Sequence, residues 1–109
     1  MAQEYIVVEP KNDLGTIKLN KSVFDSIAKN VVEDDENVKL VEGNRILKQG
    51  VETKISENSL KLNLVVKVKH NANVSDVCAN LQTKIFESIS YMTDYKPDTI
   101  TVQVVGFIF

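Results

Sequence analysis

A long alternating stretch in the second half of the chain decides the fold, and it reads Leu60-Lys61-Leu62-Asn63-Leu64-Val65-Val66-Lys67-Val68. Its even-numbered positions are all Leu or Val. Side chains of a β-strand alternate between the two faces of a sheet. The stretch therefore predicts a strand with one face in the core and the other face wet or covered by a partner.

An amphipathic helix is predicted directly after this strand. Asn73 is its predicted N-cap, with Asp76 three residues further on in a weak form of the capping box. A single apolar stripe then recurs at three- and four-residue spacing: Val74, Val77, Cys78, Leu81, Ile85, Ile89 and Met92. The segment from Thr93 to Pro97 ends the helix, because proline cannot continue it.

A final strand is predicted at the end of the sequence, and its two alternating sets of side chains differ. One alternating set is predicted to face the helices: Ile100, Val102, Val104 and Ile108. The opposite set, Val105, Phe107 and Phe109, then faces away from them. Large exposed apolar patches often mark partner surfaces, so these three residues form a candidate partner surface. The alternative is that the N-terminal segment or a neighbouring strand covers them.

The first half of the chain alternates strand and helix patterns. A short strand is predicted over residues 15–19, followed by a helix that Asn20 caps and that ends near Glu33. The stripe of this helix consists of Val23, Phe24, Ile27, Ala28 and Val31. Further strands are predicted over residues 38–41 and 51–55, separated by a turn at Gly43-Asn44 and a loop over residues 45–50. A hairpin turn over residues 56–59 leads into the long strand.

These elements predict an α+β fold in the order strand, helix, strand, strand, strand, helix, strand. We expect a two-layer sandwich with two helices on one face of a mixed, mainly antiparallel sheet. The last strand should run parallel to the long strand, since a helix-length crossover joins them. Residues 1–13 are expected to be a flexible leader, in which Ile6 to Val8 could add a short edge strand, and residues 14–109 a single domain.

Composition excludes several classes of protein. The 109 residues are 43% hydrophobic and 26% charged with a net charge of −2, values typical of an ordinary globular domain. Neither this charge nor the 6% aromatic content favours nucleic-acid binding. No apolar run approaches the roughly 20 residues of a membrane span. The single Cys suits a reducing compartment, so we expect a cytoplasmic protein.

The residues for catalysis, cofactor binding or metal binding are largely missing. His70 and Cys78 are the chain's single His and single Cys. We interpret Cys78 as a small core residue and His70 as a surface residue at a strand-to-helix corner. The acidic run over residues 33–36 lacks the ligand pattern of a calcium loop, and no glycine-rich phosphate loop occurs. We therefore predict no catalytic, cofactor or metal site.

Three lysines on the polar face of the long strand are the remaining candidate. Lys61, Lys67 and Lys69 could meet anionic lipid, nucleic acid or an acidic partner. The simpler interpretation, which we favour, is an exposed face that lysines keep soluble and unpaired.

Several short motifs, in order, resemble one protein family. They are Lys48-Gln49-Gly50-Val51, Asn73-Val74 with Val77, Met92-Thr93-Asp94 and the ending Val102 to Phe109, preceded by the strand over residues 15–19. Together they resemble the alkaline-shock-protein family, envelope-stress proteins of Gram-positive-type bacteria. The chain departs from the family pattern at Asn37 and Asp94, where glycine is usual, and at Lys69-His70, where Tyr-Gly is usual.

The resemblance implies a non-enzymatic protein linked to envelope homeostasis. Some relatives self-assemble or associate with the membrane through a membrane-anchored partner, and others are linked to lipid or fatty-acid metabolism. The preferred hypothesis is thus an interaction or scaffold module that binds itself or a protein partner. The alternative is a regulatory small-ligand-binding module assisted by Lys61, Lys67 and Lys69.

Overall fold

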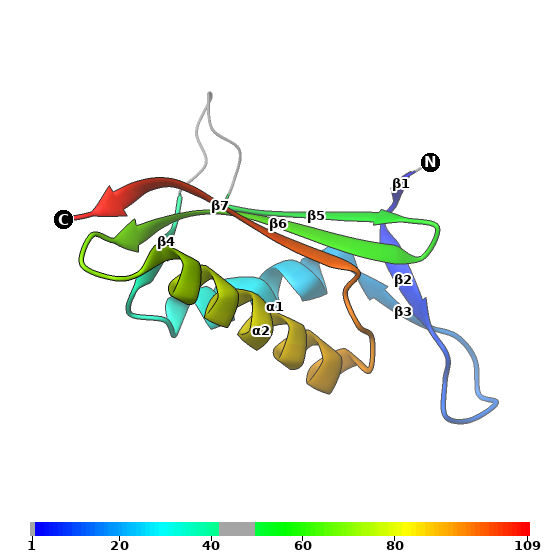
Figure 1. The fold of residues 1–109 in the computed structure, drawn as a ribbon. Helices are drawn as coiled ribbons and strands as arrows, with labels where there is room; N and C mark the ends of the chain where they lie inside the picture. Colours follow the sequence, from blue (N-terminus) through cyan, green and yellow to red (C-terminus); the bar gives the residue numbers. More distant parts are fainter. Residues whose placement is uncertain (1, 42–49) are drawn as a thin grey trace.

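The computed structural model describes residues 2–41 and 50–109. The described residues form nine helices and strands, which are labelled in Figure 1. Their bounds are β1 (Ala2–Gln3), β2 (Tyr5–Val8), β3 (Ile17–Asn20), α1 (Lys21–Glu33), β4 (Val38–Leu40), β5 (Val51–Ser56), β6 (Ser59–Lys69), α2 (Val74–Thr93) and β7 (Thr99–Ile108). The predicted turn at Gly43-Asn44 and most of the loop after it lie outside the described residues.

Strand β6 is the central strand of the main sheet. Its first half pairs antiparallel with β5, and its second half pairs antiparallel with β4 on the same edge. β7 pairs with the opposite edge and runs parallel to β6, as the crossover through α2 predicts. β1 extends the sheet beyond β5. Among the described elements β7 is therefore the last strand on its side.

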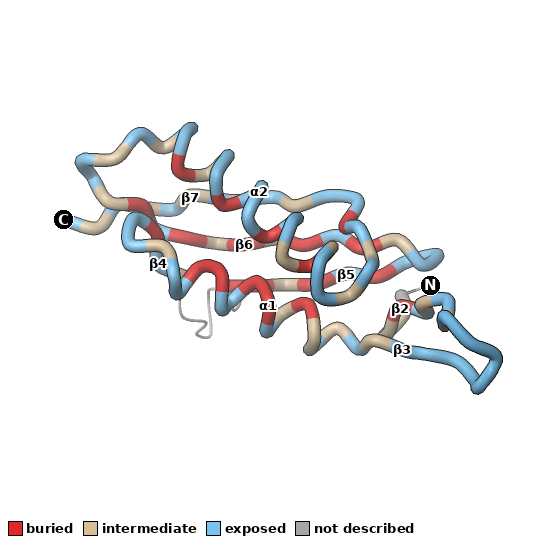
Figure 2. Tube along the Cα trace, turned by 90° about the horizontal axis from the view of Figure 1, so that it is seen from below, coloured by how far each residue is buried: buried red, intermediate tan, exposed pale blue. Residues whose placement is uncertain are grey.

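The two helices lie side by side on one face of this sheet, as Figure 1 shows. Figure 2 looks onto the helical layer and shows buried residues concentrated where the helices meet the strands. The alternating leucine and valine positions of β6, together with Leu81, Ile85 and Ile89 of α2, are at most 1% exposed. The predicted α+β sandwich and its element order are confirmed.

A short strand forms within the N-terminal segment, where the sequence allowed one over Ile6 to Val8. Tyr5 to Val8 form β2, which pairs antiparallel with β3 in a separate two-stranded sheet. Ile6 is fully buried and belongs to the same core cluster as Phe24 of α1. Burying one isoleucine contributes roughly 1.5–3 kcal/mol toward ordering this segment. β3 pairs with β2 and therefore belongs to this small sheet rather than to the main one.

The ends of both helices lie where the sequence predicts, but they are capped differently. The Asn73 side chain accepts a hydrogen bond from the Asp76 amide at 3.1 Å, as predicted for the start of α2. Asn20 precedes α1 without a side-chain cap bond, and the Lys21 amide instead donates to the Glu4 carbonyl at 3.1 Å. Asp94 ends α2 in the left-handed conformation with φ of 58°, a conformation that glycine adopts most readily at this position.

Candidate interaction surfaces

Strand β7 presents a long free edge. It is ten residues long and carries no charged side chain. No described strand pairs with the edge turned away from β6. Proteins usually protect such edges with lysine, proline, bulges or short strands, because unpaired backbone groups can template another strand. Of these devices, β7 has only a bulge.

The backbone N–H and C=O groups of β7 point alternately toward β6 and toward the free edge. Two hydrogen bonds show which residues point each way. The Ile100 carbonyl accepts a hydrogen bond from Gln82 Nε2 of α2 at 2.9 Å, so it points to the free edge. By the two-residue period, Val102 and Val104 turn their backbone groups the same way. The Ile108 carbonyl instead accepts a bond from the His70 amide, at the end of β6. Between these contacts the alternation must shift by one residue.

The shift is a β-bulge at Val105. Val66 is in register with Val104, but the next residue, Lys67, is in register with Gly106. One extra residue in β7 reverses which side chains face the helices beyond this point. Gly106 accordingly lies against the Lys67 side chain, where an added Cβ would be 3.7 Å from Lys67 Cε.

The bulge changes the side of the sheet on which part of the predicted candidate partner surface lies. Val105, Phe107 and Phe109 are 44%, 48% and 93% exposed. Phe107 is in register with Val68, a core residue, so it lies on the helical side of the sheet, while Ile108 is in register with Lys69 on the other side. The expectation that Ile108 faces the helices and Phe107 faces away is thus reversed, because the alternation does not continue through the bulge.

The two phenylalanines form a small aromatic cluster with His70 at the end of β7. The rings of Phe107 and Phe109 meet edge to face at 6.4 Å, and Phe109 stacks on His70 at 5.2 Å. His70 Nδ1 lies 3.0 Å from the Ile108 carbonyl oxygen. His70 is therefore placed to hold the end of β7, at the exposed strand-to-helix corner expected from the sequence.

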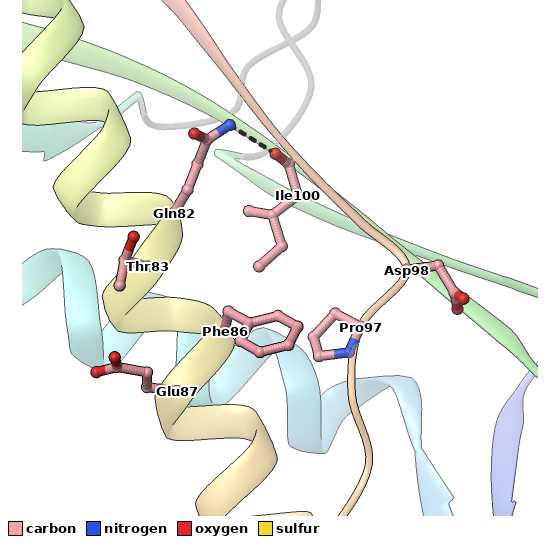
Figure 3. Close-up of a pocket in the computed structure, with 7 residues that line it drawn as sticks. All are labelled: Gln82, Thr83, Phe86, Glu87, Pro97, Asp98 and Ile100. Carbon is pink, nitrogen blue, oxygen red and sulfur yellow. Dashed lines mark hydrogen bonds between the residues drawn. The ribbon is translucent and has the colours of Figure 1, made fainter.

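A shallow groove lies beside the start of β7, between this strand and α2. Its volume is about 420 Å³, and Figure 3 shows Phe86 of α2 directed toward Pro97 and Ile100. Phe86 is 38% exposed. The dashed line in Figure 3 is the Gln82–Ile100 hydrogen bond, which occupies one edge carbonyl of β7. Sequence reasoning overlooked this groove because Phe86 lies outside the predicted apolar stripe.

Lys61, Lys67 and Lys69 lie on the sheet face opposite the helices, as the alternation of β6 predicts. The strand register adds two lysines that the sequence did not connect with them. Lys54 of β5 is directly opposite Lys61, and Lys39 of β4 is directly opposite Lys67. The five lysines are therefore brought together by the pairing of strands that are distant in the sequence.

The described residues supply little chemistry for catalysis. Burial raises the pKa of the Cys78 thiol, which makes its nucleophilic thiolate scarcer at neutral pH. The predicted burial of Cys78 is partial, since it is only half-buried on α2. No group of three His, Cys, Asp or Glu side chains in the described ranges is arranged to hold a metal ion.

Comparison with known proteins identifies one family. A model of the alkaline-shock-protein family, described as having a cell envelope-related function, matches residues 9–109. This match confirms the resemblance that the short sequence motifs carry. A search of curated proteins found no match. Within residues 2–41 and 50–109, neither helix is long and apolar enough to cross a membrane.

Proposed function

Because the chain belongs to the alkaline-shock-protein family, whose function is related to the cell envelope, we propose that it is a non-enzymatic interaction module for envelope homeostasis. It acts in the cytoplasm by strand pairing through the free edge of β7. The strand that it receives comes from a second copy of the chain or from a membrane-anchored protein. The observation that carries this proposal is the ten-residue, uncharged edge strand.

The available length of this edge is limited at both ends. Gln82 occupies the Ile100 carbonyl near the start of β7. The bulge at Val105 interrupts regular pairing further along. The edge between them centres on the outward backbone groups of Val102 and Val104. An added strand would gain main-chain hydrogen bonds there, the mode of recognition by which sheets accept extended peptides.

The composition of β7 also favours pairing with its own copy. Two copies of an edge strand that pair antiparallel bring equivalent side chains close together, so a charged strand would repel itself. The exposed positions before the bulge are Thr99, Thr101 and Gln103, which are polar but uncharged. The resulting contact is two-fold symmetric, as in most homodimers.

A proline substitution tests the proposal by removing one outward N–H. Val104→Pro should leave the contacts with β6 largely intact, because proline is tolerated where the N–H faces away from the neighbouring strand. Val104→Thr keeps both the shape and the N–H and serves as the matched control. In size-exclusion chromatography with light scattering, we expect the wild type and Val104→Thr to gain mass with concentration and Val104→Pro to remain monomeric.

Two further results test whether the chain associates through the β7 edge. Phe107→Ser should weaken association less than Val104→Pro, since the half-exposed Phe107 lies beyond the bulge. A strictly monomeric wild type that also captures no protein from a lysate prepared with its membranes would contradict the proposal.

A regulatory ligand-binding module linked to lipid metabolism is the second candidate. An apolar groove of about 410 Å³ between the start of α1 and the end of α2 favours it, lined in part by Leu19, Val23, Ile27 and Met92. None of the lysines of the sheet face lines this groove. Titration with a fluorescent fatty acid should then give saturable binding that Val23→Glu abolishes, and absence of saturation would exclude this candidate.

A further inference from the structure

The sheet face opposite the helices concentrates positive charge from three neighbouring strands. We call the residues Lys39, Lys54, Lys61, Lys67 and Lys69 the lysine face. All five belong to the same side of the sheet by strand register. Four are exposed and Lys69 is half-buried. Glu52 is the one carboxylate among the register-paired residues of this side in the described chain.

The arrangement places like charges directly opposite each other. Lys39 faces Lys67, and Lys54 faces Lys61. Such cross-strand pairs oppose folding. Lys54 has a partial partner in Glu52, with 3.9 Å between Nζ and Oε1. For the other four lysines, no carboxylate of a described residue lies within ion-pair distance. A sheet face that only has to be soluble could carry lysines and carboxylates in alternation. The concentration of lysines on this face therefore indicates an anionic partner.

The helical side of the molecule has the opposite balance. It includes the acidic connection from Glu33 to Glu36 and the exposed Asp76 and Glu87 of α2. The chain therefore combines a net charge of −2 with one strongly positive face. An extended negative surface would attract the lysine face and repel the side beyond the helices, which would orient the protein.

We propose that the lysine face docks on the anionic lipid surface of a membrane. The five lysines are spread over three neighbouring strands, which suits a planar array of headgroups better than a single bound molecule. Ile108, in register with Lys69, adds an apolar side chain at its rim. A membrane surface is also part of the cell envelope, to which the function of the family is related.

Nucleic acid fits this face less well than lipid. None of the register-paired residues on the lysine face is aromatic. Single-stranded nucleic acids are held largely by bases stacked on aromatic rings. A lipid surface requires no stacking, and each lysine close to it strengthens binding by roughly fivefold.

Vesicle co-sedimentation of the full chain tests the proposal. We expect binding to vesicles of equal parts phosphatidylglycerol and phosphatidylcholine, weakening as salt is raised, and no binding to phosphatidylcholine alone. The double variant Lys67→Gln/Lys69→Gln should bind about 25-fold more weakly. The matched control Lys29→Gln/Lys84→Gln removes the same charge from exposed helix positions and should change binding less than twofold.

The other outcomes overturn the proposal. Absence of binding of the wild type to anionic vesicles would contradict it. Equal losses of vesicle affinity in both double variants would also contradict it, because binding would then depend on net charge and not on the lysine face. Tighter binding to an RNA oligonucleotide or to poly-glutamate, lost with the same two lysines, would assign the face to that partner instead. Circular dichroism should show both variants folded, and Val104→Pro should bind vesicles as the wild type does, which separates this surface from the β7 edge.

Discussion

Lys39 of β4 and Lys67 of β6 stand directly opposite each other in an antiparallel pair, on the sheet face that the helices leave uncovered. Lys67→Glu should turn this repulsion into attraction and stabilise the fold by about 0.5 kcal/mol. For a domain of this size, that corresponds to a rise in melting temperature of roughly 2–4 °C. The rise should shrink in about 1 M salt, where the Debye length is only about 3 Å. An unchanged or lower melting temperature at low salt would show that the two charges do not interact.

Tyr95 links the segment after α2 to the β5–β6 hairpin. Its hydroxyl donates to the Asn58 carbonyl and lies 3.5 Å from Asp98 Oδ2. Burial, followed by the negative charge of Asp98, raises the pKa of Tyr95. The folded state thus favours the protonated phenol, and its contribution is complete below about pH 10 and is lost as the pH rises through the raised pKa.

Tyr95→Phe tests this relationship through urea unfolding at pH 8 and about pH 11. At pH 8 the variant should be less stable by about 1 kcal/mol, because a hydrogen bond is lost. At the higher pH the difference between the two proteins should shrink, since ionisation destabilises the wild type and phenylalanine does not ionise. A constant difference at both pH values would contradict the assignment.

Gly50 directly precedes β5 and lies close to the end of β4. A Cβ at this position would lie 2.8 Å from the Val41 carbonyl oxygen and 3.0 Å from Leu40 Cβ. Gly50→Ala should therefore destabilise the fold by about 1–3 kcal/mol, the usual cost of overpacking. Gly106→Ala is the matched control, because its Cβ meets only the flexible Lys67 side chain at ordinary distance. Equal losses in both variants, measured by urea unfolding, would contradict the steric explanation.

Asp94 ends α2 with φ of 58°, a conformation that disfavours side chains with a Cβ. Asp94→Gly should stabilise the protein by about 1 kcal/mol, which thermal unfolding can detect. Its ion pair with Lys11 is exposed and contributes little. Asp94→Ala removes the same carboxylate but keeps the Cβ, so it should give no comparable gain. A gain as large with alanine would attribute the effect to charge instead.

The sequence predicts elements that depend on local chemistry and fails where distant strands meet. The cap at Asn73 and the alternation of β6 are visible in a few adjacent residues, and both are present in the structure. The burial of Ile6 depends on its joining the core cluster that contains Phe24 of α1, and the pairing of Lys39 with Lys67 depends on strand order. Neither relationship leaves a local pattern.

The bulge at Val105 shows the same limit within a single strand. Val104 and Val105 suit either face of a sheet, so the alternation of β7 can be extended through them without any visible break. Only the register with β6 shows that Phe107, and not Ile108, lies on the helical side. The sequence therefore identifies the strand that carries the exposed apolar residues, whereas the side of the sheet on which Phe107 lies could not be predicted.

Residue-resolved amide hydrogen exchange tests the use of the β7 edge most directly. In dilute protein, the amides of Val102 and Val104 face the free edge and should exchange faster than those of Thr101 and Gln103, which face β6. As the protein is concentrated and its mass rises, Val102 and Val104 should become protected, while Thr101 and Gln103 stay slow throughout. Exchange at Val102 and Val104 that remains fast in the associated protein would contradict strand pairing through β7.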